Sequence, residues 1–69
     1  MGALDDALLA AHAADDKPAL VALYAQAADQ AKDVDAACFY LTHAYVFALE
    51  TGHRDRDALH KRLAAHGRV

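Results

Sequence analysis

The sequence predicts an all-α fold of four short helices, and three observations support this class. Strong helix formers dominate, with Ala alone supplying 19 of the 69 residues. No segment keeps the alternation of apolar and polar residues that marks a strand. Four segments that begin with aspartate recur along the chain (DDAL, DKPAL, DVDAA and DRDAL), and aspartate is favoured at helix N-caps. Residues 1–69 are expected to form a single domain.

The first two helices are expected over about residues 3–14 and 17–32. In the first, Leu4, Leu8 and Ala11 recur at helical spacing. Proline at position 18 falls in the first turn of the second helix, where its missing N–H costs little. The predicted apolar stripe of this second helix consists of Leu20, Leu23, Tyr24, Ala27 and Ala31.

The third and fourth helices are expected over about residues 34–51 and 55–66. Gly52 and Gly67 follow them, and glycine is the usual left-handed residue after a helix. The fourth helix has only Leu59 and Leu63 as large apolar residues. Because all the connections are short, neighbouring helices should pack antiparallel.

The composition limits the size of the core. Hydrophobic residues make up 57% of the chain, but Ala accounts for about half of them. A core in a chain this short rarely supplies more than about 3–5 kcal/mol without a disulfide, a metal or a partner subunit. The single cysteine, Cys38, excludes an intramolecular disulfide. The expected support is therefore a second copy of the chain, and a homodimer is the expected state.

Catalysis is the least favoured function. The chain has no serine, so a nucleophile would have to be Cys38 or a threonine. Cys38 lies in an apolar run, where a thiol usually behaves as an inert hydrophobe. On a helical wheel it points away from His43 and Glu50. Neither HExxH nor CxxC occurs, so we expect no metal, no cofactor and no enzyme activity.

Charge and the N-terminal residues point to a cytoplasmic protein. The start, MGALDDALLA, is acidic where a secretory signal needs positive charge, and the longest uncharged stretch is too short to cross a bilayer. We therefore expect no membrane association. The formal net charge of −3 is uneven, because residues 1–51 are acidic and residues 52–69 are mildly basic.

The third predicted helix carries the candidate interaction site. It is apolar around most of its circumference, and its modest neighbours cannot cover all of it. Phe39 and Val46 fall inside its polar stripe, which predicts a protein-contact strip made of Phe39, His43, Val46 and Glu50. The partner is expected to be a second copy or another protein. The alternative is that Phe39 is a single exposed aromatic residue, which is common in soluble proteins.

Residues 18–51 resemble a tetratricopeptide-type helical hairpin, in which large and small side chains interlock between two helices. The matching positions are Val21, Tyr24, Ala25, Ala37, Leu41 and Ala44. The resemblance implies an adaptor that binds proteins and does not transform small molecules. Arrays of this kind usually need about three repeats to form a stable stack. The four helices are thus expected to form either an antiparallel bundle or an array of this type.

A second resemblance, to a helix-turn-helix, supplies the alternative function of a small DNA-associated regulator. Ala48, Gly52 and Ala58 stand at the spacings that this unit favours, and Lys61 and Arg62 follow on the last helix. However, Asp55 and Asp57 would bring carboxylates towards the phosphates at the start of that helix. The few basic residues would give only weak, salt-sensitive binding, so we do not expect a nucleic-acid partner.

Overall fold

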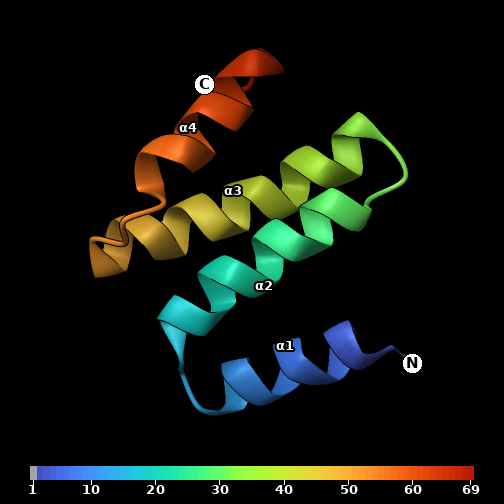
Figure 1. Ribbon diagram of the computed structural model, residues 1–69, viewed down its shortest axis with the longest axis vertical. Coiled ribbons are helices and arrows are strands. Elements are labelled where there is room, and N and C mark those ends of the chain that lie inside the picture. Colours follow the sequence, from blue (N-terminus) through green and yellow to red (C-terminus); the bar gives the residue numbers. More distant parts are fainter. Residues whose placement is uncertain (1) are drawn as a thin grey trace.

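The computed structural model describes residues 2–69, and this part of the chain contains four helices and no strand. They are α1 (Ala3–Ala13), α2 (Lys17–Gln30), α3 (Val34–Thr51) and α4 (Arg56–Ala65) (Figure 1). The all-α prediction is confirmed. The predicted bounds of α3 agree with the structure to the residue, and those of the other helices differ by at most two residues.

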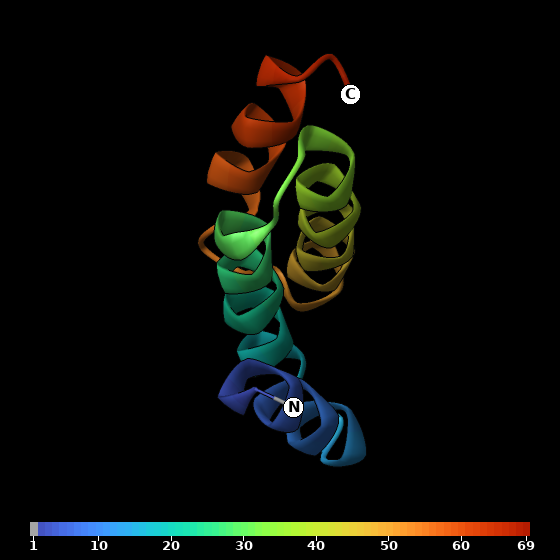
Figure 2. The ribbon, with the colours of Figure 1, turned by 90° about the vertical axis from the view of Figure 1, so that its right-hand side faces the viewer.

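The helices form an open succession in which each packs mainly against the next one along the chain. Figure 1 shows α1 and α4 at opposite ends, with α2 and α3 antiparallel between them. Figure 2 shows α3 displaced to one side of α2 and α4, so the succession is a shallow zigzag. The Cα atoms span 31 × 28 × 12 Å, a thin slab. The four helices thus form an all-α bundle of open outline, with α1 and α4 at its opposite ends.

The thin shape does not leave an unusually large surface. The accessible area is 4389 Å², and a monomer of this mass is expected to expose about 4200 Å². The total exposed area is therefore ordinary for a monomer, and the surface differs from an ordinary one only in the large apolar residues that line it.

The main core lies between α2, α3 and α4. Its fully covered residues are Val21, Ala28, Cys38, Leu41, Ala44, Ala48, Leu59 and Leu63. Ala44 and Ala48 have 0% exposure, and their small side chains allow the neighbouring helices to approach α3 closely. Leu59 and Leu63, the two apolar anchors predicted for the last helix, are both buried. Leu41 and Val21, two of the interlocking positions of the hairpin resemblance, lie in this core.

The predicted apolar stripe of α2 was too narrow. Leu20 and Ala27 are buried as expected, but Val21 and Ala28 are also buried and were not included. The reason is that α2 lies between two neighbours: Val21 and Ala28 belong to the core shared with α3, while Ala27 lines a groove with Leu4 and Leu8 of α1. A helix that packs against two neighbouring helices buries two stripes of apolar residues, whereas a helix with one neighbour buries a single stripe.

Aspartate caps two of the four helices as predicted. The carboxylate of Asp16 accepts from the backbone N–H of Ala19 at 3.3 Å, and that of Asp33 accepts from Ala36 at 2.8 Å. The N-cap of α1 is Gly2, which has no side chain to contribute. Asp55 stands at the N-cap of α4, but its side chain makes no capping hydrogen bond there.

Three of the described helices end in the same left-handed turn. Gly52 (φ 62°) and Gly67 (φ 69°) follow α3 and α4 as predicted. Asp15 (φ 51°) does the same after α1, and it is the only residue other than glycine with positive φ among residues 2–69. The backbone N–H of Asp16 donates to the carbonyl of Ala11 at 2.9 Å, which completes a Schellman motif. This turn therefore uses an aspartate where glycine is preferred.

Replacing Asp15 with glycine should stabilise the fold by about 0.5–1 kcal/mol. The left-handed conformation costs a residue with a side chain about 1–2 kcal/mol, and the greater freedom of glycine in the unfolded chain offsets about 0.5–1 kcal/mol of that gain. Urea denaturation measures the difference. The matched control is Gly52→Ala, which should lose a similar amount, because a Cβ at Gly52 meets nothing within 4 Å. If Asp15→Gly leaves the midpoint unchanged while Gly52→Ala lowers it, the left-handed strain at Asp15 is relieved by other contacts.

Candidate functional site

The four predicted strip residues lie on one face of α3. Phe39 is 60% exposed and Val46 is 47% exposed, which are high values for large apolar side chains. His43, between them, is half-buried, and Glu50 is exposed. The spacing of four, three and four residues keeps all four near one line along the helix. We call these residues the α3 strip.

An ion pair lies at or just beyond each end of the strip. At the C-terminal end, Nζ of Lys17 donates to Oε2 of Glu50 at 3.1 Å. Beyond the N-terminal end, Nη2 of Arg68 donates to Oδ1 of Asp35 at 2.5 Å. The hydrogen bond to Glu50, with the attraction of its charge, raises the pKa of Lys17 above 10.5. The hydrogen bond to Asp35 raises the pKa of Arg68 in the same way. Both cations therefore stay charged through the neutral range.

His43 is fixed in place by its own helix and by aromatic neighbours. Its Nδ1 lies 2.8 Å from the carbonyl oxygen of Phe39. A carbonyl only accepts, so Nδ1 carries the proton in this arrangement. The imidazole centroid lies 4.5 Å from the ring of Phe39 and 5.1 Å from the ring of Tyr24, on which it stacks. The ring of His43 is thus a rigid part of the strip.

The aromatic contacts continue across α2 to α1. The ring of Tyr24 also stacks on Phe47 with a centroid distance of 5.9 Å. Its hydroxyl lies 2.8 Å from Nε2 of His12, and His12 in turn meets the edge of the Phe47 ring. Sequence reasoning missed this cluster. The four-residue spacing of Phe39, His43 and Phe47 was a local signal for part of it, but the positions of Tyr24 and His12 depend on how three helices pack.

A shallow apolar hollow of about 250 Å³ opens on the strip. Its lining comes from Thr42, His43, Val46 and Phe47, all on α3. Phe39 stands one turn nearer the N-terminus on the same face. A protruding aromatic ring and a hollow therefore lie next to each other on this surface.

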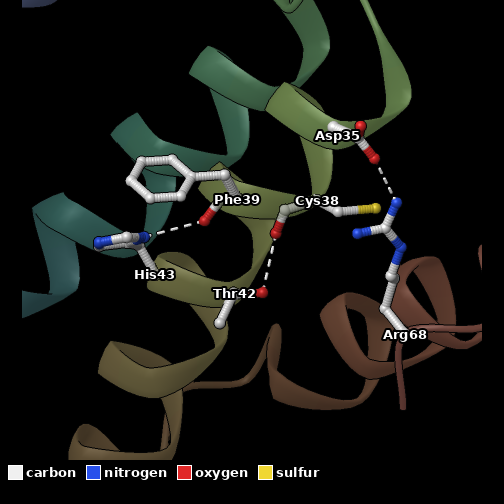
Figure 3. Close-up of a pocket in the computed structure, with 6 residues that line it drawn as sticks. All are labelled: Asp35, Cys38, Phe39, Thr42, His43 and Arg68. Carbon is white, nitrogen blue, oxygen red and sulfur yellow. Dashed lines mark hydrogen bonds and ion pairs between the residues drawn. The ribbon is translucent and has the colours of Figure 1, made fainter.

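A second hollow, of about 470 Å³, lies beside the first near the C-terminal residues (Figure 3). Cys38 forms part of its wall but is only 3% exposed. Figure 3 shows its sulfur directed towards Arg68, while the ring of His43 points the other way. The hydroxyl of Thr42 donates to the carbonyl of Cys38 at 2.8 Å and is occupied within the helix. The thiol of Cys38 thus faces Arg68, and His43 is directed away from it.

Several basic residues in and after the turn between α3 and α4 pair with carboxylates of the chain. Nη2 of Arg62 donates to Oδ1 of Asp29 at 2.6 Å, so this guanidinium ties α4 to α2. Carboxylate oxygens of Asp55 lie 3.7 Å from Nδ1 of His53 and 3.9 Å from Nε of Arg54. Part of the basic charge that the helix-turn-helix resemblance would direct towards DNA is therefore paired with carboxylates of the chain itself.

Within residues 2–69, no three His, Cys, Asp or Glu side chains gather closely enough to hold a metal ion. In the same residues, no helix combines the length and the hydropathy that crossing a bilayer requires. Comparison with family models, curated proteins and solved structures finds no significant match to the chain.

Proposed function

We propose that this chain is a small protein-interaction module that acts as a homodimer, with the α3 strip at its interface. The observation that carries the proposal is the exposure of Phe39 and Val46 on one face of α3, while Leu41 on another face of the same helix is buried. Full burial of one such side chain is worth about 1.5–3 kcal/mol. A symmetric dimer buries Phe39 and Val46 of both copies, so four side chains contribute to the free energy of binding.

The arrangement of the strip also favours a protein partner. His43 and Phe39 are held by a backbone hydrogen bond and by ring contacts, so little side-chain freedom is lost on binding. A strip one helix wide covers less than the roughly 800 Å² per partner of a standard interface. We therefore expect a dimer that dissociates on dilution, with a dissociation constant of about 1–100 μM, or about −8 to −5 kcal/mol.

The double substitution Phe39→Asp with Val46→Asp should make the chain monomeric at every accessible concentration. It places four carboxylates in the symmetric interface, and we expect the dissociation constant to rise at least about 100-fold. Mass in solution is measured by sedimentation equilibrium from about 1 μM to 1 mM. Helicity should stay unchanged, because both side chains are exposed.

The control for this measurement is Leu9→Asp, which alters an equally exposed apolar residue on α1. It should leave the mass of the dimer as it is. A wild-type chain that remains monomeric at 1 mM would contradict the proposal, and so would a double variant that still dimerises.

A further inference from the structure

We propose that two copies pair antiparallel along α3, about a two-fold axis near Thr42 and His43, with Phe39 of each copy seated in the hollow of its partner. This inference rests on the homodimer proposed above and specifies its geometry. The occupant of the strip is a second copy of the chain, and three features of the surface indicate this occupant and its direction.

The first feature is the placement of the ring and the hollow. A two-fold interface uses the same patch on both copies, so a protrusion must meet a depression of the same surface. Phe39 lies on one side of Thr42, and the hollow, lined by residues 42–47, lies mostly on the other. Antiparallel pairing centred near Thr42 brings each Phe39 opposite Val46 of the other copy. Parallel pairing would set Phe39 against Phe39 and leave both hollows empty.

The second feature is the spacing of the exposed residues. Phe39, Thr42, Val46 and Leu49 are all exposed and follow one another at intervals of three, four and three residues. Intervals that alternate between three and four residues place these side chains along one seam of α3, as in helices that pack side by side. The helices within the chain use other faces of α3, where Leu41, Ala44 and Ala48 lie. The seam is therefore available to a helix from outside.

The third feature is the charge along the strip. The whole chain carries a net charge of −3, which opposes self-association. Along the strip, however, Arg68 neutralises Asp35 and Lys17 neutralises Glu50. Antiparallel pairing in the same register sets Asp35 of one copy beside Glu50 of the other, so each end of the interface holds two cations and two anions. A neutral, apolar strip fits a copy of itself better than it fits a strongly basic or acidic protein.

Disulfide trapping tests the direction of pairing. Two variants are made in a Cys38→Ala background, one with Thr42→Cys and one with Leu49→Cys, and each is treated with oxidised glutathione. A disulfide needs Cα atoms within about 7 Å of each other. In the antiparallel dimer the two copies of residue 42 lie near the axis. The two copies of residue 49 lie about 20 Å apart along it, at 1.5 Å per residue.

We expect most of the Thr42→Cys variant to become covalent dimer and the Leu49→Cys variant to remain uncrosslinked. Efficient trapping of Leu49→Cys, or trapping of neither variant, would overturn the antiparallel pairing. The mass of the unoxidised variants separates this result from failure of the proposed function. A dimer with the wrong trapping pattern removes only the geometry, whereas a monomer at 1 mM removes both proposals. Circular dichroism of each variant confirms that the helices have formed.

Discussion

Replacing Leu41 with alanine should leave much of the chain unfolded at 25 °C. Leu41 is 1% exposed and belongs to the core shared by α2, α3 and α4. A leucine-to-alanine change at such a position costs about 2–5 kcal/mol, through lost burial and the cavity left behind. A core of this size supplies only about 3–5 kcal/mol in all. Thermal melts followed by circular dichroism should show a loss of about 8–40 °C in Tm, at about 4–8 °C per kcal/mol for a domain of this size.

Leu9→Ala is the matched control for this prediction, because it removes the same atoms from a leucine that is 62% exposed on α1. Its effect should stay within about 0.5 kcal/mol. Both variants are compared at one protein concentration, since the proposed dimerisation would make Tm depend on concentration. Equal losses for Leu41→Ala and Leu9→Ala would mean that the described core does not carry the stability of the chain.

Local signals were enough to define most of the helices. Asp33 and Gly52 bracket α3, and both act as predicted, one by accepting a hydrogen bond from Ala36 and the other by adopting positive φ. These signals work because a cap or a left-handed turn involves only residues within about four positions of one another. The turn after α1 escaped this reasoning, because its left-handed residue is Asp15 and not a glycine.

The candidate strip could also be derived from local pattern, since helical periodicity alone places Phe39 and Val46 on one face. The ion pairs at the two ends of the strip could not be derived from local pattern. Lys17 and Glu50 are separated by 33 positions, as are Asp35 and Arg68. Their pairing depends on where α2 and the C-terminal residues lie relative to α3, and no spacing in the sequence encodes this. The same limit hid the second buried stripe of α2.

Enlarging Ala44 to leucine should destabilise the fold by about 1–3 kcal/mol, although leucine forms helices nearly as well as alanine. Ala44 has 0% exposure and lies in the same core as Leu41. Extra carbon atoms there must push α3 away from its neighbours. The control is Ala10→Leu, because Ala10 lies on the exposed surface of α1 and the added atoms meet solvent. This control should change the free energy of unfolding by no more than about 0.5 kcal/mol. Urea denaturation of the two variants measures the contrast. If Ala44→Leu is as stable as Ala10→Leu, the open succession of helices can widen at no cost, and close packing through small residues does not hold α3 in place.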